Sequence, residues 1–252
     1  MCPRLSQVLL TDENWLQRIA TRINYADFGV EWACGRGALT EYLLPERNFL
    51  LGMELDENFC RKLAGKFENS NLFLIQTDIL KYPLPDKHTP YPLVGNLPYH
   101  LTGPLLIKIL RNSPKLNSFA GLIQQEVARR IIARPGDRNY GSLSLLFDLY
   151  GRVEAVYDLP PGAFSPPPEV NSTWIEFFPA KNDLNFESAR KLTRKCFRYP
   201  RKTLLNNLAE NKEMKKRWRQ WLQEKGIDSR IRPNKLTPEL FLEVHSKWKE
   251  IL

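Results

Sequence analysis

The chain has 252 residues, of which 42% are hydrophobic and 26% charged, as is typical of a soluble globular protein. No apolar run approaches the roughly 20 residues that a membrane-spanning helix needs, so a membrane partner is not expected. Its four cysteines form no C-x-x-C pair and its three histidines are scattered. We therefore expect no disulfide framework and no metal, and a reducing, cytoplasmic location.

The net charge of +9 is unevenly distributed. Residues 1–180 hold 18 Lys and Arg against 19 Asp and Glu, whereas residues 181–252 hold 19 against 9. A basic block of this kind suits a phosphate backbone or an anionic membrane surface. A solvated helical exterior is the alternative, but it usually carries mixed signs, so the block predicts binding to nucleic acid.

The N-terminal part begins with a predicted helix over residues 13–23, capped by Thr11 or Asp12. A short strand at 28–32 and a glycine turn with Gly35 and Gly37 follow, and then a helix. This order predicts the first unit of a doubly wound α/β domain, whose glycines let the backbone approach a ligand. Thr40 stands where a dinucleotide fingerprint has its third glycine, which argues against a nicotinamide-dependent oxidoreductase.

Acidic residues follow the next two predicted strands. The strand at 49–53 ends in Glu54, 17 residues beyond Gly37, where a carboxylate can accept both hydroxyls of a ribose. The alternative is that this acid is merely an exposed residue at the start of the next helix. That description fits Asp56 and Glu57 better than Glu54. The strand at 72–75 precedes Asp78, a candidate acceptor for the amine of adenine. The ordered series predicts a site for an adenosyl ligand.

A fourth strand, at 92–95, leads into Asn96-Leu97-Pro98-Tyr99. A hydrogen-bonding amide beside an aromatic ring suits a planar base with an exocyclic amine. The alternative is a proline turn in which Asn96 only caps the following helix.

Later strands are predicted at 119–123, 153–159 and 172–178, around a proline-rich loop at 160–168. The prolines restrict this loop, so Phe164 is either a rigid aromatic that stacks on an extruded base or a plug in the core. The composition favours neither the stacking role nor the core position for Phe164.

From residue 181 the pattern becomes helical and basic. We expect a first domain over 1–180 and a small all-α RNA-binding domain over 181–252, with Trp218, Trp221 and Trp248 in its core. The candidate RNA-binding residues are Arg190, Lys191, Arg194, Lys195, Arg198, Arg201 and Lys202.

Together these residues resemble the KsgA-type family of small-subunit rRNA adenine dimethyltransferases over nearly the whole chain. The motifs that carry the resemblance are residues 30–40, Glu54, Asp78, 96–99, 163–172 and 201–204. The resemblance implies a Rossmann-like sheet that binds S-adenosylmethionine, with a small all-α C-terminal domain. The implied catalytic residues are Asn96, Leu97, Pro98, Tyr99 and Phe164. The implied cofactor-binding residues are Val8, Leu10, Glu31, Ala33, Gly35, Gly37, Glu54, Asp78 and Asn96.

Three positions depart from the family pattern: Ala33 occupies the usual first glycine of the cofactor loop, Val8 replaces a polar residue, and His100 stands where Asn is usual. The expected function is dimethylation of the exocyclic amine of adenines in small-subunit rRNA during ribosome maturation, by a monomer. One alternative is the related antibiotic-resistance methyltransferase of large-subunit rRNA. Another is a non-catalytic RNA-binding assembly factor with a drifted cofactor loop.

Overall fold

The structure is a computed structural model that describes residues 8–23, 27–46 and 48–251. The chain divides into two compact units. Unit 1 comprises Met1–Ala128 and Arg152–Ala180, and unit 2 comprises Arg129–Gly151 and Lys181–Leu252. One division falls after Ala180, at the predicted domain boundary, but unit 2 also takes in the segment Arg129–Gly151, which the sequence assigned to the first domain.

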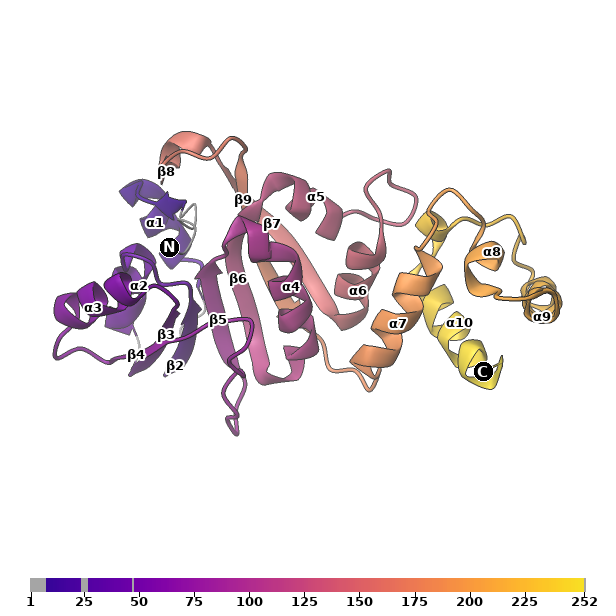
Figure 1. Ribbon diagram of the computed structural model, residues 1–252, viewed down its shortest axis with the longest axis horizontal. Helices are drawn as coiled ribbons and strands as arrows, with labels where there is room; N and C mark the ends of the chain where they lie inside the picture. The colour runs from indigo at the N-terminus through magenta and orange to yellow at the C-terminus, as the bar shows by residue number, and fades with distance from the viewer. Residues whose placement is uncertain (1–7, 24–26, 47, 252) are drawn as a thin grey trace. The chain divides into compact units, whose positions relative to one another are not determined.

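Unit 1 is built on a seven-stranded sheet with the strand order β4-β3-β2-β5-β6-β9-β7 (Figure 1). Its strands are β2 (Phe28–Trp32), β3 (Phe49–Glu54), β4 (Leu72–Gln76), β5 (Tyr91–Asn96), β6 (Leu116–Gln124), β7 (Gly151–Leu159) and β9 (Ser172–Pro179). The first five in spatial order are parallel, and β9 runs antiparallel to β6. The expected α/β, Rossmann-like fold is confirmed, and the carboxyl ends of β2 to β5 share one edge.

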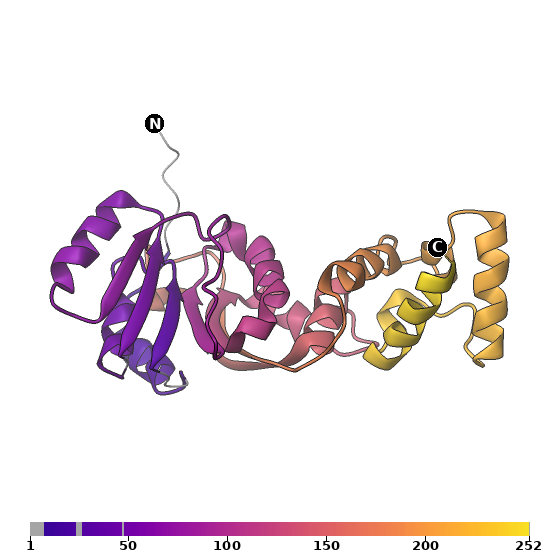
Figure 2. The same ribbon diagram turned by 90° about the horizontal axis from the view of Figure 1, so that it is seen from below.

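Helices cover both faces of this sheet. They are α1 (Glu13–Ala20), α2 (Ala38–Leu43), α3 (Glu57–Lys66) and α4 (Thr102–Arg111), whereas α5 (Gln125–Ile131) follows β6 and spans the division after Ala128. Figure 2 shows α1 and α2 on one side of the strands and α3 on the other. Asp12 is the residue that caps α1, because its carboxylate accepts the Trp15 N–H at 3.1 Å.

A two-stranded ribbon joins the N-terminal segment to the proline-rich loop. In it β1 (Leu9–Leu10) pairs antiparallel with β8 (Phe164–Ser165), and the Thr11 N–H donates to the Ala163 carbonyl at 3.0 Å. Segments about 155 positions apart in sequence are thus held side by side. The ribbon packs on a hydrophobic cluster that includes Leu10, Leu16 and Trp174, each at most 5% exposed.

Unit 2 is helical. It contains α6 (Ser142–Tyr150), α7 (Phe186–Cys196), α8 (Leu204–Leu208), α9 (Lys212–Glu224) and α10 (Pro238–Ile251). The three tryptophans are buried in it, as expected: Trp218 is 0% exposed, Trp221 7% and Trp248 4%. In the described ranges no helix is long and apolar enough to cross a membrane.

Candidate active site and basic groove

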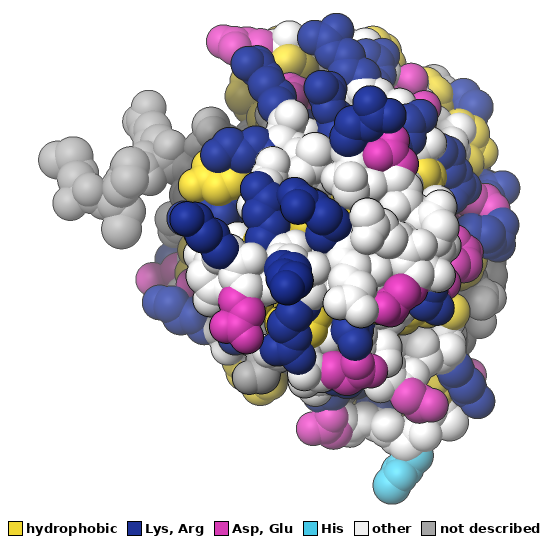
Figure 3. Space-filling model, turned by 90° about the vertical axis from the view of Figure 1, so that its right-hand side faces the viewer, with side chains coloured by type: hydrophobic (Ala, Val, Ile, Leu, Met, Phe, Trp, Pro, Cys, Tyr) yellow, Lys and Arg dark blue, Asp and Glu magenta, His cyan; other side chains and the backbone are white. Residues whose placement is uncertain are grey.

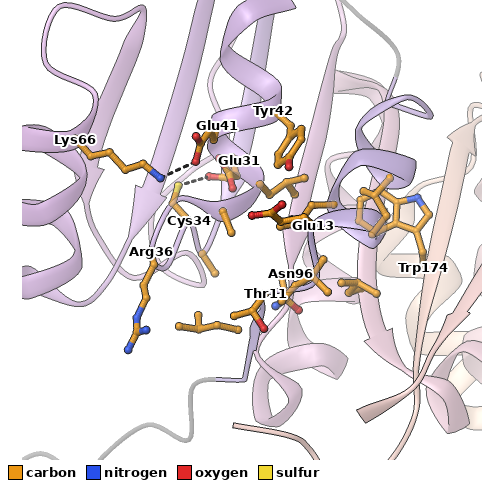
Figure 4. Close-up of a pocket in the computed structure, with 18 residues that line it drawn as sticks. Thr11, Glu13, Glu31, Cys34, Arg36, Glu41, Tyr42, Lys66, Asn96 and Trp174 are labelled. Carbon is orange, nitrogen blue, oxygen red and sulfur yellow. Dashed lines mark hydrogen bonds and ion pairs between the residues drawn. The ribbon is translucent and has the colours of Figure 1, made fainter. Parts of the chain in front are cut away.

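Two cavities lie at the carboxyl edge of the sheet in unit 1. Cavity A, of about 320 Å³, is lined by Gly35, Glu54, Asp78 and Tyr99 among others. Cavity B, of about 330 Å³, is lined by residues that include Glu31, Arg36 and Trp174 (Figure 4). Leu9, Ala33 and Asn96 line both cavities. Asn96 therefore borders both cavities, together with Leu9 and Ala33.

The loop between β2 and α2 borders both cavities and has an unusual backbone. Ala33, Gly35 and Gly37 have positive φ values of 57°, 56° and 79°. A Cβ on Gly37 would come within 2.6 Å of the Leu63 side chain, so the loop packs tightly on α3. The loop is held in place by the Ala33 N–H, which donates to the Met53 carbonyl at 2.8 Å. The sequence predicted this glycine turn, and the structure shows that both of its glycines have left-handed backbone conformations.

Ala33 carries a side chain where its backbone favours glycine. The left-handed conformation costs an L-residue about 1–2 kcal/mol, whereas glycine loses about 0.5–1 kcal/mol more than alanine on folding. We therefore expect Ala33→Gly to stabilise the protein by about 0.5–1 kcal/mol and to raise its Tm by about 2 °C in thermal unfolding. The matched control is Ala64→Gly, at an exposed position within α3, which should lower Tm instead. A lower Tm for Ala33→Gly would contradict the assigned strain.

Glu54, at the end of β3, is 6% exposed and has three backbone donors. Its carboxylate accepts the N–H groups of Gly35 at 2.8 Å, Leu55 at 2.8 Å and Asp56 at 2.9 Å. A carboxylate has about four acceptor positions, so about one remains for a ligand hydroxyl rather than the two that the sequence assigned to it. Glu54 thus also fixes the position of the cofactor loop.

Asp78 lies in the turn after β4 and lines cavity A. One of its carboxylate oxygens, Oδ1, accepts the Leu80 N–H at 2.9 Å, and its Oδ2 is 3.8 Å from the exposed Lys81 ammonium. No described residue donates a hydrogen bond to Oδ2, and the role of Asp78 as acceptor for the amine of adenine stays a prediction.

Lys108, on α4, was not identified from the sequence, although it is hydrogen-bonded to the turn that follows Asp78. Its ammonium donates to the carbonyls of Ile79 at 2.5 Å, Leu80 at 3.3 Å and Tyr82. Burial lowers the pKa of Lys108, and the Asp78 carboxylate opposes part of that shift. Lys108 lies about 30 residues from the turn in sequence, so no local pattern connected the two.

Cavity B contains a buried acid from β2. Glu31 is 2% exposed, and its Oε2 accepts the Thr40 hydroxyl of α2 at 2.7 Å. Figure 4 shows Glu31 and Asn96 facing this cavity, whereas Arg36 extends away from it. Of the predicted N-terminal cofactor residues, Val8 lines cavity A and Leu10 lines cavity B.

Asn96 is tied to the N-terminal segment. Its Nδ2 donates to the Val8 carbonyl at 3.0 Å, and no described residue donates to its Oδ1. The next residue, Leu97, is 1% exposed, and its N–H donates to Leu122 O at 3.2 Å. Its own carbonyl accepts no hydrogen bond from the residues that the structure describes. Two acceptor oxygens therefore remain available next to each other in the chain.

Pro98 and Tyr99 complete the motif and line cavity A. The Tyr99 hydroxyl is hydrogen-bonded to that of Ser172, at the start of β9. Burial raises the pKa of Tyr99, and this hydrogen bond offsets part of the rise. Tyr99 is therefore a protonated phenol near neutral pH and not a base.

Phe164 is buried, so the expectation that its ring stacks on an extruded base is wrong for the conformation that the structure describes. Its ring is 4% exposed and packs in the cluster that contains Leu10 and Trp174. It lines neither cavity. The physical reason is its pairing with Leu10 in the β1–β8 ribbon, which turns the ring toward the core. The second alternative, a core plug, describes its position.

The predicted RNA-binding residues of α7 line one open groove in unit 2, of about 780 Å³. We call it the basic groove; its lining residues are Glu187, Arg190, Lys191, Arg194, Lys195, Arg198, Tyr199, Asn206, Asn207, Ala209 and Glu210. Two acidic residues reduce the positive charge of the groove. Glu187 pairs with Arg190 at 3.9 Å, and the hydrogen bond from Lys195 lowers the pKa of Glu210. Arg201 and Lys202 are exposed but do not line it.

Comparisons with known proteins agree with this fold and site. A model of the family "Ribosomal RNA adenine dimethylase" matches residues 2–250. The chain is 33% identical to the ribosomal RNA small subunit methyltransferase A of Levilactobacillus brevis, over 95% of this chain and 87% of the relative. It superposes with a TM-score of 0.84 on a dimethyladenosine transferase from Plasmodium falciparum, with 26% identity over 96% and 98% of the two chains. The 23S rRNA methyltransferase ErmE, at a TM-score of 0.73 and 21% identity over 96% and 99%, shares the fold.

The fold and the site define a methyltransferase of the Rossmann-like class. Within this class, the chain belongs to the ribosomal RNA adenine dimethylase family. The expectation of an enzyme that uses S-adenosylmethionine and acts on adenines of rRNA is thereby confirmed. In the described part of the chain no three His, Cys, Asp or Glu side chains are grouped to hold a metal ion.

Lys108 gives this site a testable feature. We expect Lys108→Met to weaken S-adenosylmethionine binding about tenfold in calorimetry, because the turn that presents Asp78 loses its donors. Lys115→Met is the matched control: Lys115 donates to the Leu84 carbonyl at 3.2 Å in the same long loop, but Leu84 lines neither cavity. Equal losses in the two variants, or none in either, would contradict a positioning role for Lys108.

Proposed function

We propose that this enzyme transfers two methyl groups to the exocyclic amine of adenines in small-subunit rRNA, during maturation of the ribosome. The observation that carries the proposal is that Asn96 lines both cavities while no described residue donates a hydrogen bond to its Oδ1 or to the carbonyl of Leu97, the next residue. The relatives with 32–36% identity that are named ribosomal RNA small subunit methyltransferase A support this choice of RNA.

The residues of both cavities fit S-adenosylmethionine. In cavity A, Glu54 and Asp78 offer acceptors for the ribose and the adenine amine, and Lys108 holds the turn that carries Asp78. The loop with Gly35 admits the methionine end, and the buried Glu31 supplies negative charge in cavity B. Val8 and Leu10 close the site from the N-terminal side. When bound, the cofactor supplies an electrophilic methyl group on a sulfonium.

Asn96 and Leu97 orient the nucleophile. The lone pair of an adenine amine is delocalised into the ring, so the free amine is a poor nucleophile. Acceptance of its two hydrogens by Asn96 Oδ1 and the Leu97 carbonyl favours a pyramidal nitrogen whose lone pair is free to react. Tyr99 stacks on the base, and Pro98 fixes the backbone between them. No strong base is needed, because the nitrogen loses its proton readily once it is cationic.

The basic groove of unit 2 binds the phosphate backbone of the RNA in this proposal. We expect a double substitution, Arg190→Ala with Arg194→Ala, to weaken RNA binding and to reduce the slope of log K against log salt by about two, because two phosphate contacts are lost. The matched control replaces Lys212 and Lys216, which are spaced equally on α9 outside the groove. A similar change of slope in the control would contradict a specific role of the groove.

The test of the proposed substrate compares the two ribosomal subunits. Immature small subunits that lack the modification, and large subunits, are incubated with the enzyme and methyl-labelled S-adenosylmethionine. We expect label in the small-subunit RNA alone. Label in the large-subunit RNA would establish the second enzymatic alternative instead, although the likeness to ErmE shows only the shared fold. A cytoplasmic location, a monomeric state and the absence of a metal remain predictions that accompany this substrate.

A further inference from the structure

An exposed aromatic ring lies in the basic groove. Tyr199 is 44% exposed, whereas the other aromatic side chains of unit 2 are buried or half-buried in the described part of the chain. It lines the groove beside Arg194 and Arg198. Exposure of a large ring costs hydrophobic free energy, and the tryptophans of the same unit avoid it by packing in the core.

The backbone that presents Tyr199 is held firmly. Asn207, 7% exposed on α8, accepts the Tyr199 N–H at 2.8 Å and donates to the Tyr199 carbonyl at 3.1 Å. Its amide also donates to the Thr203 carbonyl at 3.0 Å. Both polar groups of the Tyr199 backbone are therefore bonded to one buried side chain, so little backbone ordering is needed when the ring meets a ligand.

Two cations lie against the ring. The Lys202 ammonium is 4.5 Å and the Arg198 guanidinium 5.3 Å from its centroid. Lys202 is exposed, as is Arg198, so each can also contact a phosphate. An exposed aromatic ring beside cations that can contact phosphates is the combination with which proteins bind unpaired nucleotides, since the base stacks while the backbone is neutralised.

We propose that Tyr199 is a stacking platform for one unpaired base of the RNA that lies in the basic groove. This inference rests on the proposed binding of RNA by the groove and deepens it: the groove selects RNA with an unpaired nucleotide over a continuous duplex. A continuous A-form helix offers only phosphates and sugars to the groove, whereas a bulged or looped base offers a face to the ring.

The experiment uses the full-length protein and two RNA hairpins. One is fully paired, and the other is identical except for a single bulged 2-aminopurine. We expect Tyr199→Ala to weaken binding of the bulged hairpin about tenfold and that of the paired hairpin less than twofold. Wild type should quench the 2-aminopurine fluorescence on binding, and Tyr199→Ala should not. The salt slope should stay unchanged, because no phosphate contact is removed.

Two further variants separate stacking from bulk. Tyr199→Trp keeps an aromatic face and should retain the preference for the bulged hairpin, whereas Tyr199→Ile keeps an apolar side chain without an aromatic face and should lose it. Thermal unfolding of each variant checks that the Asn207 clamp has kept the fold. Equal loss of both hairpins in Tyr199→Ala, or no loss of either, would overturn the stacking role.

The double variant of Arg190 and Arg194 distinguishes loss of stacking on Tyr199 from loss of RNA binding by the groove. If it weakens both hairpins while Tyr199→Ala changes neither, RNA binding by the groove stands and stacking on Tyr199 is refuted. If the double variant changes neither hairpin, RNA binding by the groove is refuted and the stacking role with it.

Discussion

Replacement of Asn96 by alanine is expected to lower the rate of methyl transfer about 100- to 1,000-fold, the usual cost of removing one preorganised polar group at a reacting centre. The variant loses the Oδ1 acceptor for the amine and the hydrogen bond from Nδ2 to the Val8 carbonyl. Single-turnover assays with saturating S-adenosylmethionine isolate the first loss, because cofactor binding is then no longer limiting.

Asn112 provides the matched control for this substitution. Its Nδ2 also donates to a backbone carbonyl, that of Lys108 at 2.8 Å, but Asn112 lines neither cavity. Asn112→Ala should therefore change Tm more than the rate of transfer. A rate for Asn96→Ala within threefold of wild type would contradict the role of Asn96 at the amine.

The second large effect is expected at Glu54. The substitution Glu54→Gln places an amide NH2 where a carboxylate now accepts the N–H groups of Gly35, Leu55 and Asp56. One of these donors must then face another donor, and the ligand hydroxyl loses a charged acceptor. Since a hydrogen bond to a charged group contributes about 1.5–3 kcal/mol, we expect S-adenosylmethionine affinity to fall roughly 100-fold in calorimetry.

Glu57→Gln is the control for charge alone. Glu57 lies in the first turn of α3, three residues from Glu54, and forms an exposed ion pair with Arg61 at 2.7 Å. Its substitution should change S-adenosylmethionine affinity less than twofold, because an exposed pair of this kind contributes little. If Glu54→Gln bound the cofactor as tightly as Glu57→Gln, the assignment of Glu54 to the ribose would have to be abandoned.

The positions of the strand ends were predictable from the sequence, since each apolar strand was short and bounded by turn residues. Gly35, Glu54, Asp78 and Asn96 all follow such strands, and the structure brings all four to the wall of cavity A. Parallel strands align their carboxyl ends, so their order in the sequence was enough to place them together.

Features that depend on contacts distant in sequence were not predictable. The sequence left the orientation of Phe164 open, because only the pairing of Leu10 with Phe164 decides which way its ring turns. Lys108 reaches its carbonyls across the fold, and α6 was not predicted because its nearly continuous apolar sequence has no clear helical period. Tyr199 became notable only when the basic groove placed it among cations.

The most direct measurement is analysis, by mass spectrometry, of the nucleosides from small-subunit RNA after incubation with the enzyme and S-adenosylmethionine. If amine transfer takes place at Asn96, adenosine with two methyl groups on its exocyclic nitrogen should appear with wild type and be almost absent with Asn96→Ala. Methylation at a ring nitrogen or carbon of adenine, or equal product from the two proteins, would contradict the account.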